Sequence, residues 1–398
     1  MLITQGKTKA IYKTSQVTGD GIPVVEFRQT GDAVLADGTS TISLGGDYAL
    51  LTRQFIIEQN HNIYTLLNGL GFQTSYIGRS REGLYHKLCE PYLLEFVTRF
   101  AICNGSSILR RQPEQYGAPS QQMLLPYADS LTHLAYSSEE AHSRFFNEDG
   151  TVIPLDKPIL ETFHKKMLIE KPDGTVDLVL ESEAKKDKRY YEDGKLTGFA
   201  HEDPLLVTPN GESRSWNIYD QKKPLTAQKP LARIDSRCHS GGADLYKSKN
   251  KTSLVRPLNK SEAISASHES ALQKETQRIL HAICTAALMT NFQKAEFKND
   301  KIVFTDYIGG AFIIDGKCEF GRVKHKGVES IVLTDDLICD NMRWAFGGKP
   351  DISLRRMFQN YESPEKRIEV LATVAKGTRR WTDPNFIRKV KSKISQGR

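Results

Sequence analysis

Two lysines near the start of the chain are spaced to hold an anion. Lys7 and Lys9 lie two positions apart in Gly6-Lys7-Thr8-Lys9, and such neighbours on a β-strand point to the same face. Two ammonium groups on one face, beside glycine backbone, can bind a polyphosphate. The alternative is an exposed strand with two solvated lysines. The segment is not a Walker A loop, because the GxxxxGK[ST] pattern is absent.

A second set of charged residues alternates with apolar ones towards the C-terminal end. On a strand through residues 313–321, one face would carry Asp315, Lys317 and Glu319. The next strand would end at Asp335, so Glu319 and Asp335 could meet across neighbouring strands. Two carboxylates with open positions suit Mg²⁺, which prefers one or two carboxylates together with nucleotide phosphates. A second interpretation stays open, because Asp315-Gly316 is also a favoured two-residue hairpin turn.

The elements that must position the two lysines are mostly strands. Gly19, Asp20 and Gly21 turn the chain between the first two of them, and Pro91 predicts a bend between strand and linker. In order, we expect strands at 7–14 and 22–29, a glycine-containing loop at 36–47, a helix at about 48–67, a short strand near Tyr76 and an apolar segment at 83–102.

The rest of the chain mixes turns, strands and helices. Asp-Gly turns dominate 112–260, and the Pro-Asp-Gly at 172–174 predicts a hairpin over 168–180. Beyond it we expect a long exposed loop at 239–262, a helix at about 268–288, strands at 301–308, 311–314, 317–323 and 330–335, and a helix from about 352 to 375. This order favours an α+β fold over a doubly wound parallel sheet.

Composition excludes some classes of protein without naming one. The chain of 398 residues is 39% hydrophobic and 26% charged, as in ordinary globular proteins. No apolar run reaches the ~20 residues of a membrane span, and the first residues lack the apolar core of a signal peptide. Six cysteines without a CxxC pair predict reduced thiols in a cytoplasmic protein. The net charge of +7 favours anionic partners.

Eight segments, in order, resemble motifs of the SAICAR synthetase family. Residues 6–12 resemble its opening G-K-x-K-x-x-Y, and 35–38 resemble its glycine loop. Lys87, Pro91, Glu95 and Arg99 resemble its lysine, proline and E-x-V-x-R, and Gly105-Ser106 with the basic pair 110–111 follow as in the family. The remaining likenesses are P-I-x-E-x-F-x-K at 158–165, A-x-x-D-P at 200–204, D-x-K-x-E-F-G at 315–321 and I-V-L-x-D with a later Arg-Trp at 331–344.

The resemblance implies a two-domain α+β fold in which a β-rich domain, 1–95, binds the nucleotide. A larger domain, 96–398, would carry metal and substrate, with insertions at about 167–199 and 207–265. The implied activity is the ATP-dependent ligation of L-aspartate to carboxyaminoimidazole ribotide in purine biosynthesis, with ATP and Mg²⁺ as cofactors. A carboxylate needs activation to an acyl phosphate before an amine can attack it, so charge neutralisation and positioning suffice for the protein.

Site residues carry over position by position. The resemblance implies that Gly6, Lys7, Lys9 and Lys87 bind ATP, with the lysines on its phosphates, and that Glu319 and Asp335 hold Mg²⁺. It places Lys317 and Asp203 near the reacting carboxylate and amine. The residues implied for the ribotide and its phosphate are Arg99, Gly105, Ser106, Arg343 and one of Arg355 and Arg356, with Arg356 preferred.

The chain departs from the family at several positions. Phe100 stands where the family usually has a second arginine or asparagine, and Lys166-Met167 replaces an acidic pair. The nucleotide half of the resemblance is therefore closer than the acceptor half. One alternative is a paralogue that acts as a ligase or small-molecule kinase on another phosphorylated or carboxylated substrate.

The other alternative is a basic nucleic-acid-binding protein. The basic tail of Arg388, Lys389, Lys391, Lys393 and Arg398 favours it, but no aromatic residues are interleaved there, and a solvated helix end is the plainer interpretation. The expected partners are thus small molecules, with no membrane and no nucleic acid, and self-association into a homo-oligomer is left open.

Overall fold

The computed structural model describes most of the N-terminal and C-terminal parts of the chain. The described residues are 1–5, 9–31, 33–34, 41–42, 44–103, 152–164, 166–170, 176–180, 191–192, 195–196, 205–207, 213–215, 266–325, 328–333, 342–346, 349–352 and 363–396. Predictions that fall on other residues lie outside this part.

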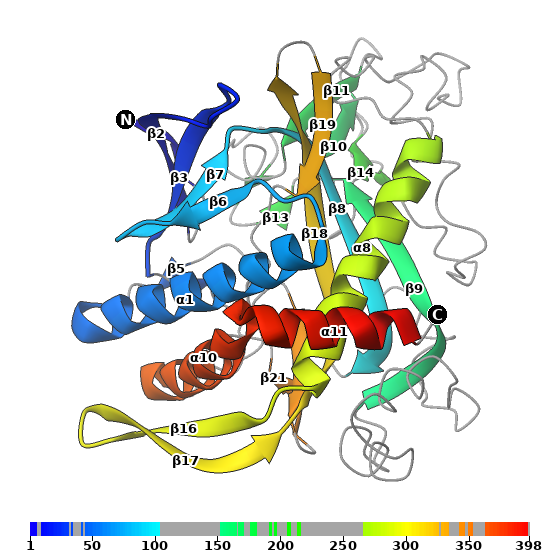
Figure 1. Ribbon diagram of the computed structural model, residues 1–398. Helices are drawn as coiled ribbons and strands as arrows, with labels where there is room; N and C mark the ends of the chain where they lie inside the picture. Colours follow the sequence, from blue (N-terminus) through cyan, green and yellow to red (C-terminus); the bar gives the residue numbers. More distant parts are fainter. Residues whose placement is uncertain are drawn as a thin grey trace.

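A five-stranded antiparallel sheet, called here the N-terminal sheet, forms at the upper left of Figure 1. Gly21 has φ +84° and its N–H donates to Thr18 O at 2.9 Å, so the expected turn between the first long strands is confirmed. The strands, in sheet order, are β1 (Leu2–Gln5), β2 (Lys9–Val17), β3 (Pro23–Gln29), β7 (Gly83–Lys87) and β6 (Tyr76–Arg79).

Helix α1 (Gly46–Leu70) packs between the N-terminal sheet and the C-terminal helices. Tyr64 is fully buried, stacks on Tyr76 at 5.2 Å between ring centroids and meets the edge of His86 at 5.3 Å. Gly71, with φ +92°, ends the helix in the left-handed conformation. The predicted helix at 48–67 is confirmed, with ends a few residues further out.

A six-stranded antiparallel sheet, the central sheet, forms the middle of the molecule (Figure 1). Its strands are β21 (Lys349–Ile352), β20 (Met342–Phe346), β18 (Ala311–His325), β8 (Glu90–Cys103) and β9 (Val152–His164) in that order, with β19 (Val328–Leu333) also paired to β18. Helix α8 (Ala266–Leu288) covers one face and confirms the prediction at 268–288. The boundary expected after residue 95 falls inside β8, whose pairing with β18 begins at Glu90; the division into two domains stays a prediction.

The hairpin interpretation of Asp315-Gly316 is wrong. β18 runs through both residues without a turn and has a strand on either side, with Asp315 opposite Arg99 of β8 and Arg343 of β20. A Cβ on Gly316 would lie 2.7 Å from a methyl group of Leu280 in α8. Glycine is thus needed for the close approach of α8 to the sheet, and it does not form a turn.

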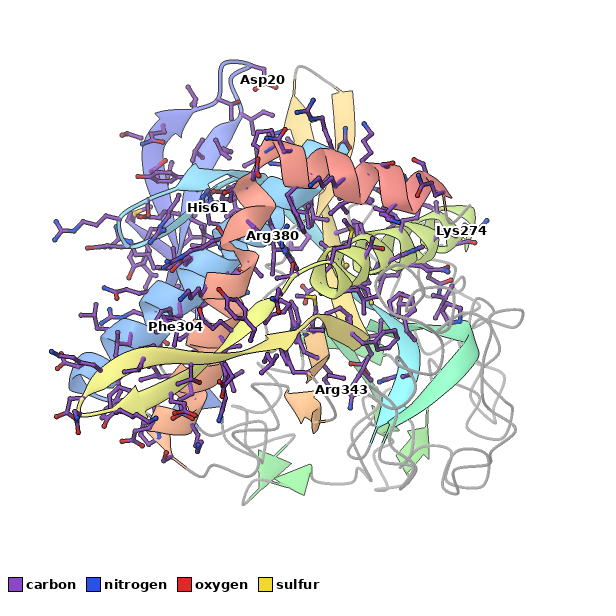
Figure 2. The ribbon with its side chains drawn as sticks, turned by 60° about the horizontal axis from the view of Figure 1, so that its bottom comes forward. Asp20, His61, Lys274, Phe304, Arg343 and Arg380 are labelled. Carbon is purple, nitrogen blue, oxygen red and sulfur yellow. The ribbon has the colours of Figure 1, made fainter. Side chains whose placement is uncertain are left out.

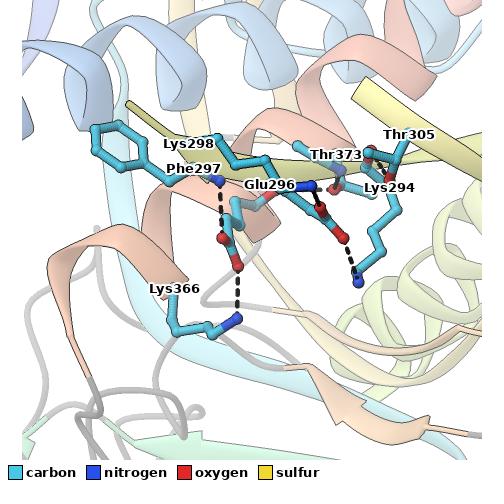
Figure 3. Close-up of polar contacts among 9 residues, drawn as sticks. Lys294, Glu296, Phe297, Lys298, Thr305, Lys366 and Thr373 are labelled. Atoms are coloured by element: carbon cyan, nitrogen blue, oxygen red, sulfur yellow. Dashed lines mark hydrogen bonds and ion pairs between the residues drawn. The ribbon is translucent and has the colours of Figure 1, made fainter. Parts of the chain in front are cut away.

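The β16–β17 hairpin (Phe292–Lys298 and Lys301–Gly309) is fastened to α10 (Pro364–Thr378) through backbone donors, as Figure 3 shows. The N–H of Ala295 donates to Thr373 Oγ1 at 2.9 Å, and that of Phe297 donates to Glu369 Oε1 at 2.8 Å. These bonds satisfy the strand edge that faces the helix.

The helix predicted from about 352 begins later. Ile352 ends strand β21, and α10 starts at Pro364, where Ser363 accepts a hydrogen bond from Lys366 N. A serine N-cap followed by proline at the first helical position is a strong start signal. Residues 353–362 lie outside the described part.

Four residues of the basic tail lie in helix α11 (Pro384–Gln396), and Arg398 lies outside the described part. Phe386 and Val390 are buried against the core, whereas Arg388, Lys389 and Lys391 are exposed. The tail is therefore a solvated helix with one apolar face.

The strands described between residues 166 and 215 are short. β10 (Lys166–Glu170) and β11 (Val176–Leu180) pair as the predicted antiparallel hairpin. The other described strands here are β12 (Tyr191–Glu192), β13 (Lys195–Leu196), β14 (Leu205–Val207) and β15 (Ser213–Ser215), and β4 (Ala33–Val34) pairs with β5 (Thr41–Ile42) near the N-terminus.

With its largest sheets antiparallel and helices packed on their faces, the fold is α+β, as predicted. Within the described segments, no helix has the length and apolar content to cross a membrane.

One buried thiol, Cys284, and one half-buried thiol, Cys89, are expected to react slowly with alkylating reagents. Burial raises the pKa of the Cys284 thiol to about 12, and that of Cys89, which packs beside Ile22 and Val323, also to about 12. At about pH 8 only about one such thiol in ten thousand is a thiolate, the form that reacts. We expect iodoacetamide to label both at least about a hundredfold more slowly in the native protein than in guanidinium, measured by peptide mass spectrometry. Equal native and denatured rates would contradict this burial.

Candidate active site

One face of β18 is charged and the other is apolar. Ile314, Cys318 and Phe320 point towards α8 and the core, with at most 3% of each exposed. The alternating positions on the opposite face are held by Asp315, Lys317 and Glu319. These three residues, with Arg99 and Arg343 from the neighbouring strands, are called here the polar face.

Asp315 binds two arginines from two different strands. Arg99 Nη1 donates to Asp315 Oδ2 at 2.7 Å, and Arg343 Nε donates to Asp315 Oδ1 at 2.7 Å. Arg343 Nη2 also donates to Asp315 Oδ2, so the guanidinium binds the carboxylate side-on. The side chains of Arg99, Asp315 and Arg343 are only 5%, 8% and 14% exposed, respectively. Charges this well buried are stable only when paired and hydrogen-bonded.

A β-bulge precedes this cluster. Asp315 lies opposite Arg343, but Ile313 lies opposite Trp344, so Ile314 is an extra residue on β18. Bulges are common beside active sites because they re-aim side chains. Here the bulge sets Arg343 on the polar face while Trp344 stays fully buried. Figure 2 labels Arg343, which lies there below α8.

Lys317 and Glu319 extend the polar face along β18. Lys317 Nζ lies 3.9 Å from Glu319 Oε1, and the two side chains are 23% and 11% exposed. In the register, Lys317 lies opposite Val97 and Glu319 opposite Glu95.

The donor set is suitable for a hard divalent cation. The buried carboxylate of Glu319 is an oxygen ligand of the kind that Mg²⁺ prefers, and Mg²⁺ needs only one or two of them beside phosphates. In the described ranges no three His, Cys, Asp or Glu side chains gather as a complete metal site. Glu319 could serve as one protein ligand of such an ion, and its predicted partner, Asp335, lies outside the described part.

The polar face leads to the N-terminal sheet. By alternation, Val323 lies on the same side of β18 as Glu319, and it packs with Ile22 of the turn after β2 and with Cys89. Lys87, the last residue of β7, lies next to this junction, because Cys89 Sγ donates a hydrogen bond to the backbone oxygen of Lys87 at 3.2 Å.

The two described lysines of the predicted nucleotide site do not lie together. Lys9 is opposite Gln29 and Lys87 is opposite Val24, at positions of β3 five residues apart. An odd separation puts them on opposite faces of the sheet, roughly 17 Å apart along the strand at about 3.4 Å per residue. One nucleotide could contact both lysines only through different parts of the molecule.

The remaining predicted site residues lie outside the described part. They are Gly6, Lys7, Gly105, Ser106, Asp203, Asp335 and Arg356.

Asp315 is the residue that sequence reasoning did not place in the site. The alternation of Asp315 with Lys317 and Glu319 indicates that all three lie on one strand face, but the turn propensity of Asp-Gly supports a competing hairpin. Its two partners are 216 and 28 residues away in the chain.

Fold and site together define an α+β protein with paired arginines and carboxylates on one sheet face. No family model matches the chain, and no curated protein matches it. Among solved structures, a type-2 SAICAR synthetase in complex with ADP is similar, with 15% identity over 95% of this chain and 98% of that one and a TM-score of 0.45.

Two further similar structures carry related names. Phosphoribosylaminoimidazole-succinocarboxamide synthase from Ehrlichia chaffeensis is 12% identical over 95% of this chain and 99% of that one, with a TM-score of 0.43. SAICAR synthase from Saccharomyces cerevisiae, complexed with SAICAR, is 12% identical over 100% and 95%, with a TM-score of 0.39. At these values the likeness assigns no activity and no residue role to this chain.

Proposed function

We propose that the chain is an ATP-dependent carboxylate–amine ligase that joins L-aspartate to carboxyaminoimidazole ribotide and forms SAICAR. The observation that carries the proposal is the polar face. Three segments far apart in sequence, each resembling a family motif, bring Arg99, Lys317, Glu319 and Arg343 to one side of the central sheet. That side leads to the sheet that contains Lys9 and Lys87.

The reaction needs what these residue types supply. The terminal phosphoryl group of ATP passes to the ribotide carboxylate, which gives an acyl phosphate and ADP. The aspartate nitrogen then attacks the acyl carbon, a C–N bond forms, the C–O bond to phosphate breaks, and the amine loses a proton. Positive groups that neutralise and orient phosphates are the main requirement of such a sequence.

Roles for this chain's residues follow from their placement. Lys9 and Lys7 would hold the phosphates of ATP with Gly6, and Lys87, on the opposite face of the sheet, would contact another part of the nucleotide. Glu319 and Asp335 would hold Mg²⁺, which supplies charge neutralisation on the phosphates when bound. Lys317 and Asp203 would orient the carboxylate and the amine.

The ribotide phosphate would bind at the two arginines. Arg99 and Arg343 are proposed to contact it together with Gly105, Ser106 and Arg356. A guanidinium matches the geometry of a phosphate and binds it bidentately.

An ADP-release assay with carboxyaminoimidazole ribotide and a panel of amino acids tests the function. We expect ADP and an amide to form in equal amounts with aspartate and only when both acceptor and amine are present. ADP without amide would favour the kinase alternative. No ADP with any acceptor, together with salt-dependent retention on RNA or DNA, would favour the nucleic-acid-binding alternative.

Arg343→Lys separates acceptor binding from nucleotide binding. Lysine cannot reproduce the side-on contact with Asp315 or bind a phosphate bidentately. We expect the KM for the ribotide to rise about ten- to a hundredfold and the KM for ATP to stay nearly constant.

The matched control is Arg278→Lys, because Arg278 is an exposed helical arginine paired with Glu275. It should change neither constant. If the Arg343→Lys protein shows a raised KM for ATP alone, or no change in either KM, Arg343 does not bind the ribotide phosphate.

A further inference from the structure

We propose that Asp315 is a positioning residue that holds Arg99 and Arg343 together in one fixed arrangement for a phosphate monoester. The inference rests on the proposed function and deepens it, because it adds the residue that organises the acceptor phosphate site. Asp315 does not itself contact the phosphate.

The contacts around Asp315 restrict both guanidiniums. Arg343 uses two donors on one edge of its guanidinium, Nε and Nη2, so the plane of the group is set by the plane of the carboxylate. Arg99 meets the same Oδ2 atom through Nη1. A guanidinium has five N–H donors, and the contacts with Asp315 use one donor of Arg99 and two of Arg343.

A shared carboxylate also lets two positive charges stay side by side. Arg99 and Arg343 flank Asp315 on β8 and β20, and two guanidiniums in a poorly solvated place repel strongly without an anion. An arginine side chain carries about 2 kcal/mol of rotamer entropy, which is lost when a ligand immobilises it. Arginines held in place before the ligand arrives avoid most of that loss.

The backbone around Asp315 is built for precision. β18 is flanked by strands on both sides at this point, and the bulge at Ile314 comes one residue earlier. Gly316, one residue later, packs under Leu280 of α8 without a side chain. A site on such a rigid strand holds its side chains more closely than a site on a loop.

A purely structural ion pair is the competing explanation. Buried pairs often contribute little net stability, but the loss of one partner is costly because it leaves a buried charge. Under that explanation Asp315 substitutions would change unfolding but not the affinity for a phosphate ligand.

The experiment compares Asp315→Asn with Asp315→Glu in the full chain. Binding of ribose 5-phosphate, with ribose as the uncharged probe, is measured by calorimetry, and nucleotide binding is measured with ADP. We expect Asp315→Asn to weaken ribose 5-phosphate binding about ten- to a hundredfold, Asp315→Glu to retain more of it, and ADP binding to stay unchanged in both. Asp306→Asn, a substitution of an exposed β17 residue, should leave ribose 5-phosphate binding unchanged.

Unchanged or tighter ribose 5-phosphate binding in the folded Asp315→Asn protein would overturn the proposal, and so would equal weakening of ADP binding. If Asp315→Asn does not fold, a selective loss of ribose 5-phosphate affinity in Asp315→Glu still supports the proposal, and its absence overturns it. A wild-type protein that binds ribose 5-phosphate but makes no SAICAR would defeat the proposed reaction and leave the role of Asp315 standing. A wild-type protein that does not bind ribose 5-phosphate would defeat both.

Discussion

Glu319→Gln should lower ATP turnover by about a hundred- to a thousandfold with little change in stability. The amide has nearly the shape of the carboxylate but lacks the negative charge that a divalent cation requires. The Glu319 side chain is 11% exposed, and its Oε1 lies 3.9 Å from Lys317 Nζ. Loss of one preorganised electrostatic contact of this kind typically costs about that much in kcat.

The measurement is ADP release against Mg²⁺ concentration, with thermal unfolding as the check on folding. Asp335→Asn should behave in the same way if the two carboxylates share one cation. Glu296→Gln is the matched control, because Glu296 lies on the exposed side of β16 between Lys294 and Lys298. Normal turnover and an unchanged Mg²⁺ requirement in the Glu319→Gln protein would show that Glu319 does not ligate the metal.

Helical periodicity was sufficient to predict the two long helices of the core. α1 and α8 were predicted to within a few residues because long stripes of buried residues at helical spacing have few competing interpretations. The predicted helix start near residue 352 is wrong, because the Ser363-Pro364 start signal, and not the apolar pattern upstream of it, marks the first turn of α10.

Local turn propensity misled the interpretation of β18. Asp-Gly favours a two-residue turn, yet the chain continues straight through Asp315 and Gly316. Tertiary contacts decide the outcome: Asp315 is held from both neighbouring strands, and Leu280 occupies the place of a Gly316 side chain. Neither partner can be inferred from the local sequence.

The sequence predicts which residues belong to the candidate site better than it predicts how they are arranged in space. Arg99, Lys317, Glu319 and Arg343 could be named from motifs, but their common face depends on strand pairing, which one sequence does not specify. The same limit applies to Lys9 and Lys87, since only the register of β2, β3 and β7 puts them on opposite faces.

An aromatic cluster behind the polar face holds β20, the strand of Arg343, in place. Phe292 is fully buried and meets Trp344 and Phe346 edge-on at 6.1 and 5.0 Å between ring centroids. Trp344 in turn stacks with Trp381 at 6.4 Å. Gly377 of α10 packs directly against the Phe292 ring, so that a Cβ at this position would lie 2.1 Å from the ring.

Phe292→Ala should therefore lower the free energy of unfolding by about 3–5 kcal/mol. Gly377→Ala should also destabilise, by about 1–3 kcal/mol, because the Phe292 ring cannot move away from Trp344 and Phe346. That sign is opposite to the stabilisation of about 1 kcal/mol that alanine normally gives over glycine inside a helix.

The double variant distinguishes this contact from a general loss of stability. Removal of the ring leaves space for the new methyl group, so Phe292→Ala with Gly377→Ala should cost clearly less than the sum of the two single changes, as measured by urea unfolding. Residues in contact typically show coupling of about 0.5–3 kcal/mol. Strict additivity, or a Gly377→Ala protein more stable than wild type, would mean that α10 does not press on Phe292 and that β20 is held in place by other contacts.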